Sequence, residues 1–500
     1  MVDGQNKGNF SSQIDKTLKE DFELRNEFFS NRSSAIFPIY FQDFENDLIL
    51  SWLNYWTIKN KISRSCLTIN IRIYRNSGNL FHQVQLSVSE THNQFRLRSV
   101  ISEKKFYGMV EFELISTENI RFTFPAITGF YKTRSLYSCV HSAGRIKGAD
   151  ELASTSSVTE TNWTCKFSQT TSPFFHYFNG NSTENSEIIV NVHCSAGEVI
   201  ATKTITRKFA AFASEVYFLD ELFDEPFSDE GAFCSVECEN GAVFRRMVVG
   251  NYHKDLNHME VTHSFSKQTA LDFCPSVVQG YESFLALYTS PSLTLSARVF
   301  PTNCPGAYLI HESHQHYDDD RMTGIQESEE LRDGHGCIEL DNDIVMKVLW
   351  FKGKKVPSRF NCSFNYKVKG VQSRFTTDIA SGAKSNVYPN KFNHWGSGLY
   401  GGGYDFCLLV RNLSHDGKCG VTAGSLMLYG LNINQDAPIK IGENSVTEFI
   451  LSDWLRQVSN VEFDNPVIFS WYLQLDQPNS ETFWLSSRKA DGCIAGEHGF

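Results

Sequence analysis

The sequence predicts an all-β protein: a tandem array of four antiparallel β-sandwich domains, preceded by a short N-terminal helix. Two observations lead to this prediction. An eight-residue pattern recurs along the chain, and strand-like segments with alternating apolar and polar residues recur around it. The units repeat at intervals of about 100 to 125 residues, which is typical of tandem domains and leaves room for six to eight short strands in each.

The recurring octet reads β-branched residue, Glu, apolar residue, acid, Asn, any residue and two apolar residues. It occurs at 236–243, 338–345 and 461–468, and a looser copy begins at Val110. Three copies indicate duplication. Because Asn240-Gly241 is a strong hairpin signal, we expect each octet to open a hairpin, and the hairpins at 236–248, 338–350 and 461–473 to superpose.

The surroundings of the octets also repeat. Residues 214–222 and 447–455 are nearly the same segment, and β-branched strands are expected at 67–73, 188–192 and 293–299. Three units close on a strand with a His near its end, namely His141, His263 and His498, whereas the third unit has residues 364–366 there. We interpret these histidines as packed or hydrogen-bonded groups rather than catalytic ones, because active sites are seldom copied whole in tandem.

Domain boundaries follow from the polar stretches between units. We expect an N-terminal segment at 1–45 and sandwiches at 46–148, 162–270, 276–370 and 387–500, with linkers that include 371–386. Within the first segment, Ile14, Leu18 and Phe22 form one stripe, so residues 12–29 predict a short amphipathic helix that packs on the first domain. In fold the units resemble immunoglobulin-like modules, although no motif indicates a particular family.

Composition excludes several classes of protein. Net charge is −11 and no basic tract stands out, which argues against a nucleic-acid partner. The polar N-terminus lacks the apolar core of a signal peptide, and no apolar run is long enough to span a membrane. The 13 cysteines are an odd number and do not recur between units, so we expect buried free thiols and a cytoplasmic protein.

The third unit departs from its neighbours in a histidine-rich segment. On a strand, His314 and His316 share a face, and paired imidazoles of this kind bind divalent metals in β-proteins. The candidate ligands are His311, Glu312, His314, His316 and His335. The alternatives are a solvated hairpin that binds nothing and an adventitious ion; otherwise no cofactor is expected.

A glycine-rich segment opens the fourth unit. Trp395, Tyr400 and Tyr404 flank the glycines at 396–403 and could form stacking faces for a sugar. The alternative is a flexible connector that leads into the strand at 405–411. The acid pairs in the octets, such as Glu237/Glu239, are interpreted as a solvated strand face rather than as acid–base pairs.

No nucleophile elbow, phosphate loop or dinucleotide fingerprint is present, so no catalytic residue is assigned. We therefore expect a non-catalytic binding or scaffold protein that recognises a carbohydrate or a protein partner. The alternatives are a metal-dependent enzyme that uses the histidines of the third unit and a structural component of a virion or other assembly.

Overall fold

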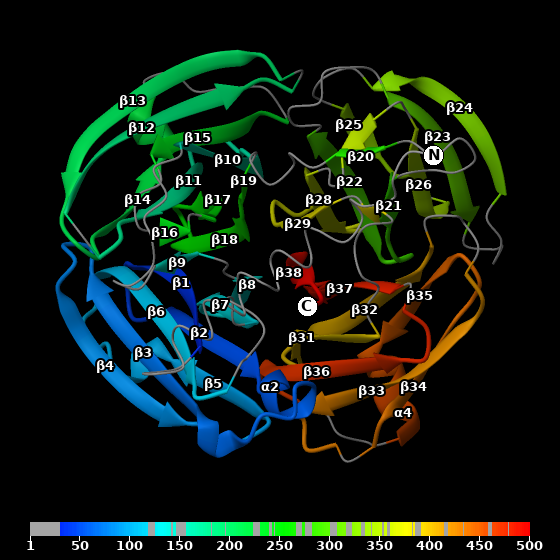
Figure 1. Cartoon of the computed structure of the whole chain (residues 1–500), viewed down its shortest axis with the longest axis horizontal. Coiled ribbons are helices and arrows are strands. Elements are labelled where there is room, and N and C mark those ends of the chain that lie inside the picture. The colour runs from blue at the N-terminus through cyan, green and yellow to red at the C-terminus, as the bar shows by residue number, and fades with distance from the viewer. Residues whose placement is uncertain are drawn as a thin grey trace, which may run out of the picture.

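Eight antiparallel sheets of four or five strands make up most of the described chain in this computed structural model (Figure 1). The structure describes residues 31–500 except for 119–125, 142–143, 147–156, 182, 196, 224–230, 240–242, 245, 267–272, 276–282, 301–307, 317–322, 332–335, 342, 353–354, 358–360, 383, 386–391, 415–418, 434, 459–462 and 479. The helix predicted at 12–29 lies outside the described residues.

The sheets occur in four pairs that follow one another along the chain. The first pair joins β1 (Asn31–Phe41), β6 (Phe106–Ser116), β3 (Leu67–Arg75) and β4 (Leu80–Ser87) in one sheet, and β5 (His92–Arg96), β2 (Asn46–Leu53), β7 (Ile127–Thr133) and β8 (Leu136–His141) in the other. The second pair joins β13 (Val199–Phe209), β12 (Glu184–His193), β15 (Phe233–Glu239), β10 (Ser157–Thr164) and β19 (Phe265–Ser266), and then β14 (Ser214–Phe218), β11 (Thr171–Phe178), β17 (Val248–His253) and β18 (His258–His263).

The third and fourth pairs are built in the same way. The third joins β24 (Thr323–Leu331), β23 (Tyr308–His316), β26 (Ile344–Lys352), β21 (Ser283–Tyr288) and β30 (Lys384–Ser385), and then β25 (Gly336–Glu339), β22 (Leu293–Phe300), β28 (Asn361–Val368) and β29 (Thr377–Gly382). The fourth joins β31 (Asn393–Tyr400), β36 (Val467–Leu475), β33 (Thr422–Tyr429) and β34 (Ala437–Ile441), and then β35 (Ser445–Ile450), β32 (Tyr404–Asn412), β37 (Ser480–Arg488) and β38 (Cys493–His498).

Short elements connect these sheets. They are the two-stranded sheets of β9 (Arg145–Ile146) with β16 (Val243–Phe244) and of β20 (Phe273–Pro275) with β27 (Lys355–Pro357), the helices α2 (Tyr55–Ile58), α3 (Leu219–Leu222) and α4 (Leu451–Val458), and the 3-10 turns at Arg64–Cys66 and Leu97–Ser99. None of the helices in the described ranges is long and apolar enough to cross a membrane.

One strand order recurs in all four pairs. When the eight main strands of a pair are numbered along the chain, one sheet has the order 1-6-3-4 and the other 5-2-7-8. In immunoglobulin constant domains the first two strands are neighbours in one sheet, whereas here they lie in opposite sheets. The first pair already begins at Asn31, ahead of residue 46, and the third pair includes β29 within the segment 371–386 that we expected to be a linker.

The hairpins expected at 236–248, 338–350 and 461–473 are wrong. The strands that flank the first two octets, β15 with β17 and β25 with β26, lie in opposite sheets, and Phe463–Pro466 precedes β36 without forming a strand. The octet at 236 begins in a sixth strand, whereas the other two lead into one, so the copies are not equivalent. The repeat of 214–222 and 447–455 is confirmed, because each is a fifth strand followed by a helix.

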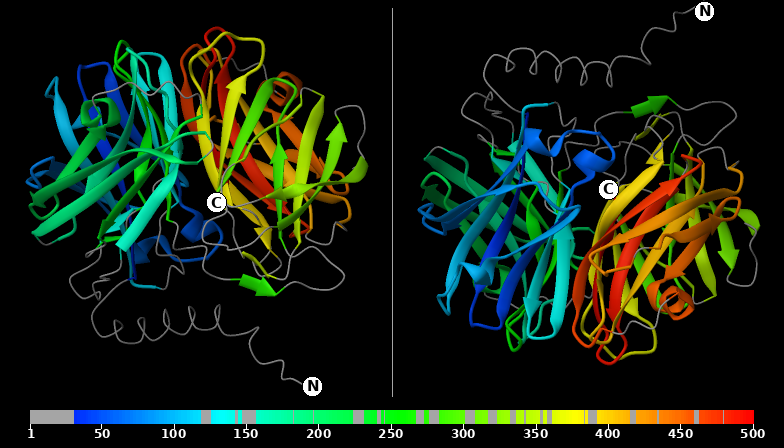
Figure 2. Two further views of the ribbon diagram at one scale, coloured as in Figure 1. Left: turned by 90° about the horizontal axis from the view of Figure 1, so that it is seen from above. Right: turned by 90° about the horizontal axis from the view of Figure 1, so that it is seen from below.

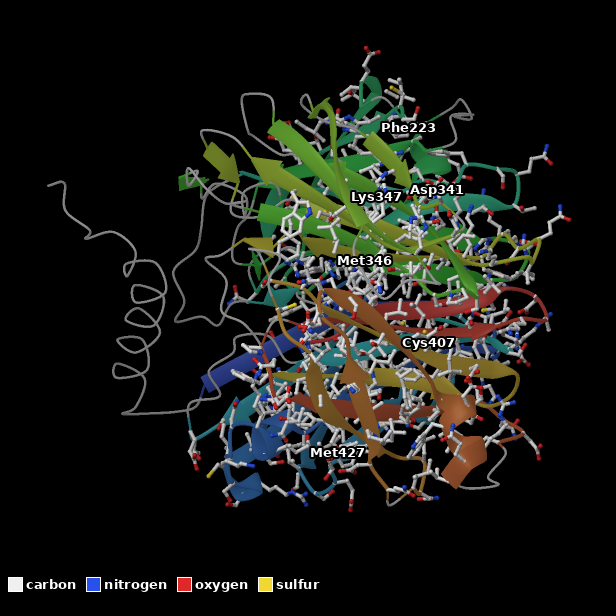
Figure 3. The ribbon with its side chains drawn as sticks, turned by 90° about the vertical axis from the view of Figure 1, so that its right-hand side faces the viewer. Phe223, Asp341, Met346, Lys347, Cys407 and Met427 are labelled. Carbon is white, nitrogen blue, oxygen red and sulfur yellow. The ribbon has the colours of Figure 1, made fainter. Side chains whose placement is uncertain are left out.

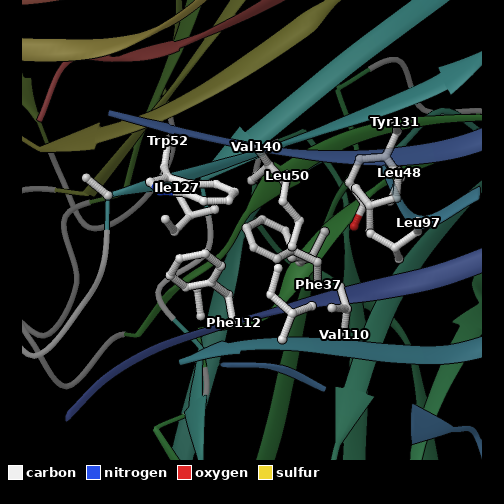
Figure 4. Packing of buried hydrophobic residues seen from close by; sticks show 14 of the residues in the cluster. Phe37, Leu48, Leu50, Trp52, Leu97, Val110, Phe112, Ile127, Tyr131 and Val140 are labelled. Carbon is white, nitrogen blue, oxygen red and sulfur yellow. The ribbon is translucent and has the colours of Figure 1, made fainter. Parts of the chain in front are cut away.

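Apolar side chains of the two sheets of a pair interlock. In the first pair, Phe37 and Phe112 from one sheet pack against Leu50, Ile127 and Val140 from the other (Figure 4). Gly129 leaves room for this contact, since a Cβ there would lie 2.7 Å from the ring of Phe37. The described part of the chain is therefore a series of sandwich-like layers.

The four pairs surround a common axis (Figure 1). Their eighth strands meet there, because β8 contacts β18 and β38, and β29 contacts the same two strands. Strands of the N-terminal and C-terminal halves lie side by side, with the C-terminus between them (Figure 2). The sheets of order 5-2-7-8 thus lie inside, and β2, β11, β17 and β18 are buried along their whole length. The polar residues of these strands, such as Glu260 and His263 of β18, are therefore buried and need partners within the protein.

Neighbouring pairs also share their cores. Phe483 of β37 in the fourth pair stacks on Tyr288, at 4.7 Å between ring centroids, and meets Phe364 edge-on at 5.2 Å, both in the third pair. Side chains fill the space between these two pairs (Figure 3). A domain that relied on its own core alone would not place its aromatic residues in this way.

We predict that Phe483→Ala lowers the free energy of unfolding by about 3–5 kcal/mol, because it leaves a cavity between two pairs. Urea denaturation of the full chain measures this. Phe392→Ala, which removes a ring that is 48% exposed, should stay within about 0.5 kcal/mol of wild type. Equal losses in the two variants would contradict a shared core.

Candidate metal centre

Three histidines meet where the eighth strands end. His141, His263 and His498 are the last residues of β8, β18 and β38. They come from the first, second and fourth pairs, and the equivalent residue of β29 in the third pair is Gly382. Because equivalent strands surround one axis, the recurring histidine becomes a cluster.

The rings lie in contact. The ring centroid of His141 is 4.3 Å from that of His263 and 4.5 Å from that of His498. Glu497 joins them, with its Oε2 3.0 Å from Nδ1 of His141. One ligand atom from each of these four residues lies within 4.8 Å of all the others, the only such grouping of metal-capable side chains among the described residues.

Backbone carbonyls orient two of the rings. Nδ1 of His263 lies 3.0 Å from the carbonyl oxygen of Ser264, and Nδ1 of His498 lies 3.1 Å from that of Gly499. A carbonyl only accepts, so each Nδ1 carries the hydrogen and donates it. In the neutral ring the lone pair is then on Nε2, the atom available to a ligand.

Burial sets the charges of the cluster. It lowers the pKa of His263 well below the ordinary value, and the nearby charges of His141, Arg246 and His498 lower it further. Burial also raises the pKa of Glu497, which His498 opposes. His263 is therefore neutral at physiological pH, the form in which imidazole binds metals.

A second polar network joins the second and third pairs beside this cluster. Oε1 of Glu260 on β18 lies 2.5 Å from Nζ of Lys166 and accepts a hydrogen bond of 2.8 Å from the hydroxyl of Thr376. Burial raises the pKa of Glu260, but Lys166 and His253 outweigh it and the pKa falls below its ordinary value. Burial raises the pKa of nearby Asp378 to about 6. This network is satisfied within the protein and acts as an internal ion pair.

The histidine-rich segment of the third unit lies on β23. His314 and His316 are two residues apart on this strand and so share a face, as the sequence predicts. His316 Nδ1 lies 3.3 Å from Oδ2 of Asp343, and both side chains are exposed. His335 and the side chains of His311 and Glu312 lie outside the described residues, so metal binding there stays a prediction.

The aromatic residues of the glycine-rich segment are part of two strands. Gly396 and Gly398 lie in β31, and Gly401–Gly403 form the turn to β32 with φ between +57° and +88°. Trp395 is buried and stacks on Tyr55 at 4.6 Å, and the hydroxyl of buried Tyr404 donates to the carbonyl of Ser135 at 3.0 Å. Tyr400 is partly buried and packs on Phe463. The rings thus contribute to packing, and sugar binding by them stays a prediction.

The acid pairs of the octets have different surroundings in the described residues. Asp341 and Asp464 are exposed, as a solvated face requires. In the looser first copy, Glu111 and Glu113 are buried instead and pair with Arg72 at 3.2 and 2.7 Å. The acidic residues of the same sequence pattern are therefore exposed in some copies and buried in an ion pair in another.

A comparison with protein-family models gives no match, and a comparison with curated proteins gives none either. Function must therefore be argued from the arrangement of the side chains.

Buried His176 and His258 and half-buried His92 lie outside the central cluster. Burial lowers the pKa of His176 and of His258 to about 3 and that of His92 to about 4. In the unfolded chain these groups titrate near pH 6.5. Acid therefore favours the unfolded chain, which binds more protons than the folded one.

We predict that the free energy of unfolding changes little between about pH 7.5 and 8 and falls as the pH drops below 6.5. Each such histidine should contribute a loss of about 2 kcal/mol by pH 5. Urea denaturation of His176→Phe at both pH values should show a smaller loss than wild type. Val190→Ala, a change in the hydrophobic core of the same sheet pair, should lower the free energy of unfolding by the same amount at both pH values. If His176→Phe loses as much stability on acidification as wild type does, buried His176 is not a source of the pH dependence.

Proposed function

We propose that this protein is a non-catalytic binding or scaffold protein built as four β-sandwich domains, at 31–141, 157–266, 283–385 and 393–498. The recurrence of one eight-strand order in all four sheet pairs supports this division. Tandem domains of one design present similar surfaces several times, which suits a binding array.

The position of the histidine cluster supports a non-catalytic function. The side chains of His141 and Glu497 are 6% and 1% exposed, and only His498, at 26%, reaches solvent appreciably. A substrate needs a concave opening lined by reactive groups. A cluster sealed between domains holds the domains together more readily than it turns over a substrate.

The outer edge strands are the surfaces best suited to a partner. β13 ends its sheet, pairs only with β12 among the described strands, and is exposed on both faces along most of its length. Val199 and Ile200 are 53% and 45% exposed at its start, and Leu80 is 52% exposed at the start of β4, the equivalent strand of the first domain. Exposed edges accept a further strand from a partner.

The occupant that this surface favours is a protein segment rather than a carbohydrate. Edge pairing uses backbone hydrogen bonds, whereas sugar binding needs exposed aromatic faces. Trp395 and Tyr404 are buried. Lys203 and Lys208 on β13 would favour a partner segment that carries acidic residues.

The thiols support the proposed cytoplasmic location. The ten cysteines that the structure describes are all free, and eight of them are buried. Secreted proteins with as many cysteines usually pair them.

We predict that Ile200→Lys weakens partner binding about tenfold or more, since a buried ammonium at the new strand pair would be costly. Affinity purification of the tagged full chain from its native cells, with quantitative mass spectrometry, identifies the partner, and titration gives its Kd. Val421→Lys is the matched control, because Val421 is 46% exposed but lies outside any strand. Equal Kd values for all three proteins would contradict binding at β13.

A further inference from the structure

We propose that His141, His263, His498 and Glu497 bind one divalent transition-metal ion, of the Zn²⁺ class, where the first, second and fourth domains meet. The donor atoms of these residues all lie within 4.8 Å of one another. In a tetrahedral site with ligand bonds of about 2.1 Å, two ligand atoms lie ~3.4 Å apart. Closing the cluster onto an ion therefore needs the longest donor–donor distance to shorten by ~1.4 Å.

The surroundings of the rings are those of a ligand set. Metal-binding histidines almost always donate their second ring N–H to a carbonyl or a carboxylate. His263 and His498 do so, to Ser264 and Gly499, so in the neutral ring each has its lone pair on Nε2. Histidines that only filled space at strand ends would have no reason to share one tautomer, whereas His263 and His498 both carry the hydrogen on Nδ1.

The donor set indicates which metals fit. Three imidazoles and one carboxylate suit Zn²⁺ and its neighbours Co²⁺, Ni²⁺, Cu²⁺ and Fe²⁺, whereas Mg²⁺ and Ca²⁺ prefer oxygen ligands. The ion would also compensate the charge of Glu497, whose side chain is 1% exposed. Cys139, two residues before His141, uses its thiol on the carbonyl of Gly496 and is no ligand.

The ion would act as a cross-link between domains. The ligands lie on β8, β18 and β38, which are far apart in the sequence and adjacent at the axis. The third domain has Gly382 at the equivalent place and is held by the Glu260 network instead. This inference concerns the junction and does not depend on partner binding at the outer edges.

Metal binding is tested on the full chain after removal of metal with a chelator. Calorimetric titration with Zn²⁺ should give one ion per chain, and the ion should raise the melting temperature. Co²⁺ in its place should give visible absorption bands typical of four or five ligands that include imidazole. These wild-type measurements decide the question even if a variant fails to fold.

Variants locate the ion. His498→Gln changes the most exposed ligand and should weaken Zn²⁺ binding about 100-fold or more. This exceeds the loss expected when only a group hydrogen-bonded to a metal ligand is removed. His82→Gln, a partly exposed histidine of β4, should bind as wild type does. Circular dichroism checks that each variant is folded.

Three results would overturn the proposal. The first is a wild-type protein that binds no ion, which would make the cluster a hydrogen-bonded polar core. The second is tight binding that survives His498→Gln. The third is binding that disappears only in His316→Gln, which would place the ion on β23.

Discussion

The closure of four final strands around one axis is the constraint on which the rest of this structure depends. Each eighth strand is the edge of its sheet and would be left unpaired in an isolated sandwich. In the ring, β8 and β29 each contact β18 and β38, so all four edges are covered. Polar side chains carried to the axis must then satisfy one another, since an unpaired buried charge costs several kcal/mol.

This requirement explains the two polar clusters at the axis. Buried Glu260 interacts with Lys166 and His253 of the second sheet pair and with Thr376 of the third. Buried Glu497 of the fourth sheet pair interacts with His141 of the first. Residues of different sheet pairs therefore satisfy one another at the axis.

The same closure divides the molecule into an inner and an outer part. Inner strands such as β11 and β18 are buried on both faces and contain histidines whose pKa burial depresses. Outer strands such as β13 keep a free edge and polar faces. Stability therefore depends mainly on the inner sheets.

Part of this could be predicted from the sequence. The all-β class follows from residue alternation, and the match between 214–222 and 447–455 identifies equivalent strand–helix segments. The hairpins predicted at the octets were wrong because a strand–turn–strand pattern does not reveal that the second strand joins the opposite sheet. The eighth strand of the third sheet pair, 377–382, could not be predicted because its Thr, Asp, Ser and Gly are typical of a linker.

The central cluster shows a further limit. The recurrence of His141, His263 and His498 at strand ends was visible in the sequence. Their convergence was not visible, because strand periodicity indicates which face a residue occupies but not which sheets surround a common axis. Glu497 gave no signal of its own, because it lies within an apparently ordinary strand, β38, directly before the recurring histidine.

Hydrogen exchange of the full chain, followed by mass spectrometry, tests the closed ring most directly. If the four sheet pairs are one body closed at the axis, the amides of β8, β18, β29 and β38 should be among the slowest and should exchange together. Independent exchange of these strands, each at the rate of its own sheet pair, or faster exchange there than in the outer sheets, would contradict the account.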